Sequence, residues 1–197
     1  MDNLSKQLDF IVELDQLKRV YRQSTVKPDN NRFENSAEHS WHISLAAQIL
    51  QEYSVEPINV SRVVSMLLIH DIVEIDAGDL FAFADVTALD KQQEKELSAA
   101  KRIFGLLSEK QYQAYKELWL EFENTETSDA KFAKAIDCIL PLIQNMNNEG
   151  GTWVKHKVSK SQVLLRNKYL EELAPKLWVY VCQQIDLAVK LGWLINK

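Results

Sequence analysis

The residues with the clearest chemical potential lie between positions 67 and 79, where a His-Asp pair interrupts an apolar run. His70 and Asp71 have leucine, isoleucine and valine on almost every side. An ionised aspartate is rarely buried unless it is paired or coordinates a metal, so both side chains are expected to face a partner inside the protein. A divalent cation satisfies an imidazole and a carboxylate together. The alternative is a neutral core histidine bonded to its neighbours, beside a solvated aspartate.

Few other residues offer metal ligands within apolar helical stripes. The chain has four histidines, at positions 39, 42, 70 and 156, and the acids embedded in such stripes are chiefly Asp71 and Asp137. Four ligands from three helices would leave coordination positions for water and substrate, and the set is His39, His70, Asp71 and Asp137. Imidazole and carboxylate ligands suit one divalent ion, without selecting among Mn, Co, Fe, Ni, Zn and Mg.

Two further side chains lie on the same predicted helical faces. Glu74 follows His70 by four residues, so it could orient or deprotonate a water that the ion has activated. The alternative is a surface acid near a helix end. His42 follows His39 by three residues and could be a ligand, a partner of a ligand or a phosphate contact, although a histidine on such a face is more often structural.

Helical periodicity dominates the chain, which has only five glycines and four prolines and hardly any period-two alternation. Apolar spacing and capping signals predict helices over 3–22, 35–53, 57–78, 87–107, 109–122, 127–143, 160–172 and 174–192. Pro141 should kink its helix or end the regular part. Loops are expected over 23–35, 78–87 and 145–153. These elements predict one compact all-α domain over residues 1–197.

Composition narrows the classes of partner. The net charge of −5 argues against a nucleic-acid surface, which normally carries a basic stripe. No apolar run approaches the ~18–20 residues of a membrane span. The two cysteines are isolated, which is typical of a reducing compartment, and the N-terminus shows no signal-peptide pattern. We therefore expect a cytoplasmic protein without nucleic-acid or membrane partners.

The combined pattern His39…His70-Asp71…Asp137 resembles the H…HD…D signature of the HD-domain metal-dependent phosphohydrolases. Three stretches are similar to the branch that contains bacterial 5′-deoxynucleotidase and its eukaryotic relatives: Glu34-Asn-Ser-Ala-Glu-His-Ser40, His70-Asp-Ile-Val-Glu74 and Gly78-Asp79. The resemblance covers about residues 10–145 and implies an all-helical HD-domain fold. Residues 150–197 then form a C-terminal helical extension, where Trp153, His156 and Arg166 receive no role from the family.

The resemblance also implies roles for individual residues. The same four metal ligands match the family, and Glu74 matches its catalytic carboxylate. Asp79 matches an acid that contacts the nucleotide sugar. Arg22 ends the segment 17–22, which resembles the one that carries a phosphate-binding arginine, a task suited to a guanidinium. Arg32 is a second candidate for phosphate by position alone.

Three departures from the family pattern bear on the substrate. Gln23 stands where the family has a tryptophan that helps to recognise deoxyribose, and the loop between Arg22 and His39 is slightly longer. An acid that precedes the last metal ligand could be Glu121 or Glu123. The metal chemistry is left intact, whereas a preference for deoxynucleotides is not implied.

The resemblance implies a small phosphorylated substrate, and we expect a phosphomonoesterase acting on nucleoside 5′-monophosphates. One alternative is hydrolysis of a pyrophosphoryl guanosine compound. The other is a metal-binding helical interaction module without catalysis. A homodimer is also expected from related nucleotidases, with apolar material near the C-terminus in Trp178, Tyr180, Trp193 and Leu194; His156 is expected to be structural or at a subunit contact.

Overall fold

The protein is described by a computed structural model that covers residues 2–83 and 86–197. Its first half contains α1 (Asn3–Leu14), η1 (Asp15–Arg19), β1 (Tyr21–Val26), η2 (Lys27–Asp29), β2 (Arg32–Asn35), α2 (Ser36–Leu50), η3 (Gln51–Tyr53), α3 (Val60–Ile69), η4 (His70–Val73) and α4 (Glu74–Ala77), where η denotes a 3₁₀ helix. Its second half contains α5 (Val86–Phe104), α6 (Glu109–Asn124), α7 (Ser128–Asn147), α8 (Gly151–His156), α9 (Lys160–Arg166), α10 (Tyr169–Leu173) and α11 (Pro175–Lys190).

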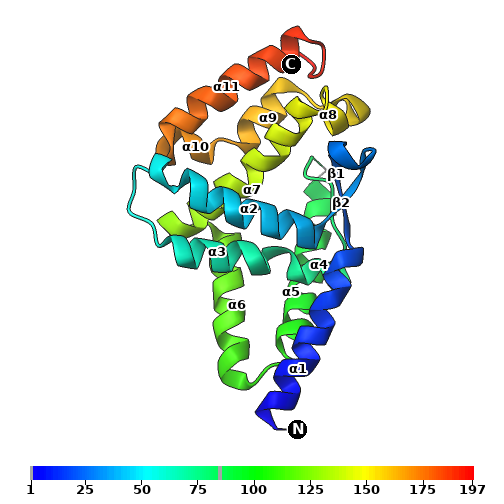
Figure 1. Cartoon of the computed structure of the whole chain (residues 1–197), viewed down its shortest axis with the longest axis vertical. Coiled ribbons are helices and arrows are strands. Elements are labelled where there is room, and N and C mark those ends of the chain that lie inside the picture. The colour runs from blue at the N-terminus through cyan, green and yellow to red at the C-terminus, as the bar shows by residue number, and fades with distance from the viewer. Residues whose placement is uncertain (1, 84–85) are drawn as a thin grey trace.

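The helices are arranged around α2, α3 and α7, which pack together in the middle of the molecule (Figure 1). Helices α1, α5 and α6 extend toward the end that carries the N-terminus, and α8 to α11 form the opposite end. Each end has its own cluster of buried apolar residues. The segment around the His-Asp pair joins them, because Met66 and Leu67 belong to one cluster and Ile72 and Val73 to the other. The pair is therefore fixed from both sides by packing.

A β-hairpin replaces the end of the first predicted helix and the predicted loop over 23–35. The α-helical part ends at Leu14, and β1 then pairs antiparallel with β2, with Thr25 opposite Phe33. Asn30 and Asn31 make the turn with φ values of 51° and 59°, a left-handed conformation that asparagine tolerates. The hairpin is short, polar and half-exposed, so its strands lack the apolar alternation that predicts a strand. The fold is otherwise helical, as expected.

The predicted helix over 57–78 is interrupted at the His-Asp pair. The α-helix ends at Ile69, residues 70–73 form the 3₁₀ turn η4, and α4 closes at Gly78 with a φ of 74°. A 3₁₀ stretch within a helix often marks a functional site, because it changes the directions of successive side chains. All four residues of η4 are buried. The interruption thus brings His70 and Asp71 into the interior together.

The second half follows the predicted helices with three differences. Helix α7 continues through Pro141 to Asn147, and the Pro141 carbonyl accepts a hydrogen bond from Asn145 Nδ2 at 2.8 Å. Part of the expected loop over 145–153 is the short helix α8, whose Thr152 N–H donates to Asn145 Oδ1. The predicted helix over 160–172 is divided into α9 and α10.

The apolar residues near the C-terminus pack mostly within the molecule. Leu194 is buried in the core cluster, and Trp178 and Trp193 pack against it, whereas Tyr180 is exposed. Within residues 2–83 and 86–197, no helix combines the length and apolar character needed to cross a lipid bilayer.

The predicted capping box at the start of α2 is confirmed and yields a stability prediction. Asn35 accepts a hydrogen bond from the backbone of Glu38, and the Glu38 side chain accepts one from the backbone of Asn35. We expect Asn35→Ala to lower the free energy of unfolding by about 1 kcal/mol, because the backbone N–H of Glu38 in the first turn loses its acceptor. Urea denaturation of the metal-free protein measures this. Asp2→Ala removes the corresponding side-chain cap from α1 and serves as the comparison. An unchanged free energy of unfolding in Asn35→Ala would contradict this role of Asn35.

Candidate active site

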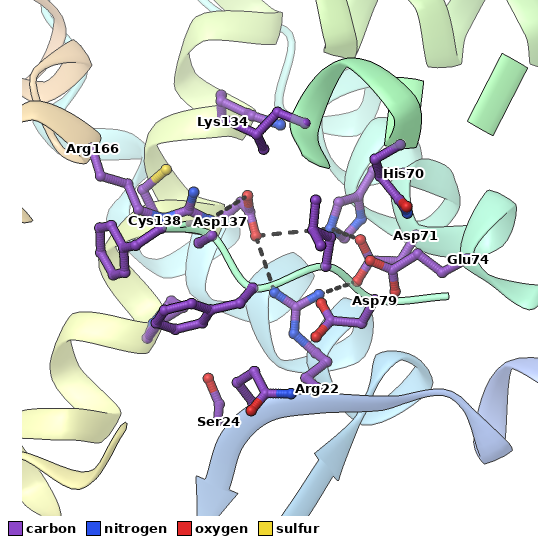
Figure 2. A pocket seen from close by; sticks show the side chains of 18 of the residues that line it. Arg22, Ser24, His70, Asp71, Glu74, Asp79, Lys134, Asp137, Cys138 and Arg166 are labelled. Carbon is purple, nitrogen blue, oxygen red and sulfur yellow. Dashed lines mark hydrogen bonds and ion pairs between the residues drawn. The ribbon is translucent and has the colours of Figure 1, made fainter. Parts of the chain in front are cut away.

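A cavity of about 440 Å³ lies where the hairpin, η4, α7 and α9 meet. Segments far apart in the sequence supply its walls, from Arg22 on β1 to Arg166 at the end of α9 (Figure 2). Ionisable side chains that line it are Arg22, His70, Asp71, Glu74, Asp79, Glu96, Glu123, Lys134, Asp137, Cys138 and Arg166. This concentration of charge in one enclosed space marks the cavity as the candidate active site.

Three of the four predicted metal ligands form a compact buried cluster beside this cavity. Ligand atoms of His39, His70 and Asp137 all lie within 4.8 Å of one another. Asp137 Oδ1 is 2.9 Å from His39 Nε2 and 3.8 Å from His70 Nε2, so it faces both rings. Asp71 lies beside the cluster, with Oδ1 at 2.9 Å from His70 Nε2. Helices α2 and α7 and the turn η4 thus supply the four predicted ligands.

The hydrogen bonding of His70 fits a metal ligand. Its Nδ1 is 2.8 Å from the carbonyl of Leu67 and donates to it, which leaves the lone pair on Nε2. Among the residues that the structure describes, none makes a hydrogen bond with that buried Nε2. An orphaned imidazole nitrogen directed at two carboxylates is what a divalent cation would satisfy. The residues present therefore fit a metal ion.

Glu34 supports His39 from the opposite side, a role that the sequence did not reveal. Its Oε2 is 3.5 Å from His39 Nδ1, and Gln144 donates a hydrogen bond to its Oε1. Burial lowers the pKa of His39, but hydrogen bonds to Asp137 and Glu34 outweigh it, so the pKa is raised overall. Ligating histidines commonly place a carboxylate on their second nitrogen. The only sequence signal was that Glu34 lies within the stretch similar to the family.

Arg22 projects from β1 toward the carboxylates of the cluster. Its Nη1 donates to Asp71 Oδ2 at 2.5 Å, and its Nη2 lies 3.9 Å from Asp137 Oδ1. Burial raises the pKa of Asp71, but the interactions with His70 and Arg22 lower it more, so this pKa lies below its ordinary value and the carboxyl is ionised. Arg22 therefore provides a fixed positive charge next to the ligand cluster. An anion at the cluster would meet this guanidinium.

Glu74 and Asp79 face the cavity with raised pKa values. Burial and the negative charge of Asp71 raise the pKa of Glu74 well above its ordinary value. Ser36, in the first turn of α2, donates a hydrogen bond of 2.6 Å to Glu74 Oε2 and fixes its orientation. Burial likewise raises the pKa of Asp79 to about 6. A positioned carboxyl whose pKa is raised from its ordinary value toward neutral pH suits general acid–base chemistry.

The remaining residues that the sequence suggested as substrate contacts or acids do not all lie at the cavity. His42 is exposed on α2, and Arg32 pairs with Glu38 and Asp29 on the surface, so neither lines the cavity. Of the two acids considered before Asp137, Glu123 lines the cavity. The other, Glu121, pairs with Arg62 instead.

Loop 78–83 and the start of β1 line the part of the cavity next to Asp79. Gln23 and Ser24 lie there together with Phe81 and Phe83. The exposed ring of His156 stacks on Phe81, with centroids 4.3 Å apart and planes tilted by 32°. Aromatic side chains therefore occur at this wall, although Gln23 occupies the position of the family tryptophan.

Three cavity residues received no role from the sequence. Lys134 and Cys138 lie on the same face of α7 as Asp137, and Arg166 comes from the C-terminal extension. Lys134 Nζ lies 4.3 Å from the centroid of the Phe122 ring. Lys134 precedes Asp137 by three residues and Cys138 by four, and this helical spacing could have indicated the first two. Arg166 offered only a basic residue in a last helical turn, which the helix dipole already explains.

Fold and site together define a helical domain with a metal site of buried histidine and aspartate side chains beside a buried arginine. The sequence pattern of the HD domain matches residues 14–178. The chain thus belongs to the HD domain family of metal-dependent phosphohydrolases.

Individual relatives agree with this assignment. The chain is 30% identical to 5′-deoxynucleotidase HDDC2 of Homo sapiens over 79% of this chain and 72% of that protein. It is 28% identical to 5′-deoxynucleotidase hdd1 of Schizosaccharomyces pombe over 68% and 70% of the two chains. A crystal structure of a predicted metal-dependent phosphohydrolase from Magnetospirillum magnetotacticum MS-1 is 44% identical, with a TM-score of 0.92 over 98% of this chain and 96% of that chain. The last match extends through the C-terminal helices.

Proposed function

We propose that this phosphohydrolase is a phosphomonoesterase that acts on nucleoside 5′-monophosphates. The observation that carries the proposal is the arrangement within one cavity of a metal-ligand cluster, the guanidinium of Arg22 and the buried carboxyl of Glu74. These are a metal site, an anion contact and an acid–base group, the parts that phosphate ester hydrolysis requires. The relatives named 5′-deoxynucleotidase support a nucleotide as the substrate.

The predicted site residues at the cavity divide the tasks of this reaction among them. His39, His70, Asp71 and Asp137 would hold the divalent ion, which supplies Lewis-acid polarisation of the phosphoryl group and activates water when it is bound. Arg22 binds phosphoryl oxygens and holds the phosphorus in line with the attacking water. Glu74, fixed by Ser36, takes a proton from that water as its oxygen bonds to phosphorus. The ester P–O bond breaks as the bond to the water oxygen forms. The nucleoside 5′-oxygen leaves with a proton from solvent, and Glu74 returns the proton that it accepted to solvent.

The sugar is expected to lie at the wall formed by Asp79, Gln23 and Ser24. The Asp79 carboxyl can accept a hydrogen bond from a sugar hydroxyl. Gln23 presents an amide rather than the flat face of an aromatic ring, so it does not provide the stacking surface of the family tryptophan. We therefore propose that both ribo- and deoxyribonucleotides must be considered as substrates.

The test is phosphate release from a panel of ribo- and deoxyribonucleoside 5′-monophosphates. We expect phosphate release to be lost when the metal is removed and to be restored by added Mn²⁺ or Co²⁺. The reason is that the bound ion would polarise the phosphoryl group and activate water. Pyrophosphoryl guanosine compounds serve as the comparison substrates. Stoichiometric metal without release from any monophosphate would overturn the proposal, and turnover of the comparison substrates would then favour the pyrophosphohydrolase alternative.

A further inference from the structure

We propose that Arg166 is a second phosphoryl-binding residue, which approaches the substrate from the side of the cavity opposite the β-hairpin. The inference deepens the proposed function and rests on it for the identity of the substrate. Arg166 is the last residue of α9 and therefore belongs to the C-terminal extension. Figure 2 shows its side chain reaching toward Asp137 while Arg22 approaches from the hairpin. The C-terminal helices would then complete the active site.

The hydrogen-bond donors of Arg166 are unused. A guanidinium carries five N–H donors, and within the part of the chain that the structure describes Arg166 makes no hydrogen bond. Its nearest carboxylate oxygen is Asp137 Oδ2 at 3.9 Å, although only 27% of its side chain is exposed. By contrast, Arg62 and Arg102 both donate hydrogen bonds to carboxylates at the surface. Largely buried donors normally have partners, so the free guanidinium indicates a missing anionic ligand.

The position of Arg166 identifies which part of the substrate it would contact. Asp137 directs Oδ1 toward His39 and His70, and its other oxygen, Oδ2, toward Arg166. Arg22 Nη2 is also 3.9 Å from Oδ1, so the two arginines flank one ligand carboxylate. An oxyanion held at the metal cluster would meet both guanidinium groups. A phosphoryl group has enough oxygens to accept hydrogen bonds from both, and its charge develops at those oxygens during transfer.

A purely structural role in neutralising Asp137 explains the geometry less well. Hydrogen bonds from a guanidinium to a carboxylate are about 2.7–2.9 Å long, and this pair is well beyond that range at 3.9 Å. Asp137 already has His39 as a hydrogen-bond partner, which lowers its pKa. Lys134, the half-buried cation on α7, lies over the Phe122 ring instead. Arg166 on α9 thus offers a planar set of donors to a ligand at this wall.

The first measurement is the binding of inorganic phosphate to the metal-loaded full-length protein by calorimetry. We expect Arg166→Gln to raise the Kd about 10- to 100-fold, the effect of losing hydrogen bonds to a charged group. Arg166→Lys should fall between that variant and the wild type, since it keeps the charge without the planar fork. Arg62→Gln removes the same charge outside the cavity and should leave the Kd unchanged. Metal content and thermal unfolding are measured for each variant.

Two outcomes would overturn the inference. If Arg166→Gln loses its metal, Arg166 acts by positioning Asp137. If it binds phosphate as tightly as the wild type but loses nucleotide turnover, Arg166 contacts another part of the substrate. Steady-state kinetics with a hydrolysed monophosphate should show a matching loss of kcat/KM. The phosphate arm needs no turnover, so failure of the proposed function, seen as an inactive wild type, is distinct from failure of this inference.

Discussion

Glu74→Gln is expected to lower kcat about 10²- to 10⁴-fold, the usual contribution of a positioned general acid–base group, while the protein keeps its metal. Glutamine preserves the shape and the hydrogen bond from Ser36 but cannot take a proton. The loss corresponds to about 3–5.5 kcal/mol of transition-state free energy. Metal analysis and kcat measured on the same samples test the prediction, because a ligand-like role would remove the ion as well.

A matched control and a second readout accompany this variant. Glu96 also lines the cavity, and burial and Glu123 raise its pKa, so Glu96→Gln should leave kcat nearly unchanged if only Glu74 transfers the proton. Near-wild-type kcat in metal-loaded Glu74→Gln would remove Glu74 from the mechanism.

Stability should respond to Glu74→Gln in the opposite direction to activity. The folded protein binds the Glu74 proton more tightly than the unfolded chain does, because burial and Asp71 raise its pKa. This contribution to stability is present at low pH and is lost as the pH rises through the folded-state pKa. The metal-free variant cannot ionise at this position and should be more stable than metal-free wild type above that pKa. Denaturation as a function of pH measures the difference.

Asp137→Asn is expected to weaken metal binding by at least about 10²-fold and to abolish turnover at stoichiometric metal. Replacing a residue that only supports a ligand often lowers metal affinity 10- to 100-fold. Replacing a direct ligand should lower metal affinity at least as much. The amide also lacks the negative charge that stabilises a cation between His39 and His70. Metal titration by calorimetry and the metal-dependent rise in Tm provide two independent measurements.

Two neighbouring glutamates, Glu34 and Glu38, provide an intermediate variant and a control for this prediction. Glu34 contacts His39, so Glu34→Gln should weaken metal binding to an intermediate extent. Glu38 pairs with Arg32 at the surface, so Glu38→Gln should leave metal affinity unchanged. Retention of tight metal binding by Asp137→Asn would show that the ion is held elsewhere.

Local sequence signals anticipated the helices well because capping and apolar spacing act within a few residues. The box of Asn35 and Glu38, the stop at Gly78 and the proline at the start of α11 all appear in the structure. The hairpin was not predicted from the sequence, because its strands are half-exposed and polar. Their stability comes from pairing between residues such as Thr25 and Phe33. The 3₁₀ turn at His70 was not predicted either, because tertiary packing and not a local signal favours it over a continued α-helix.

By itself, the sequence determined the chemistry of this protein: an embedded His-Asp pair, a second histidine and a second aspartate whose burial requires a counter-charge. Tertiary structure alone decided which other groups reach that chemistry. Ser36 and Arg166 are separated by other helices from their partners Glu74 and Asp137, and no local spacing relates them. Glu34 is close to His39 in the sequence, but it lies on the strand that precedes α2, so helical spacing does not relate them. His42 shares a periodic face with His39 yet is exposed, because the buried side of α2 is set by packing against α3 and α7. The physical reason is that periodicity specifies the face of one helix, whereas a cavity is specified by how several helices meet.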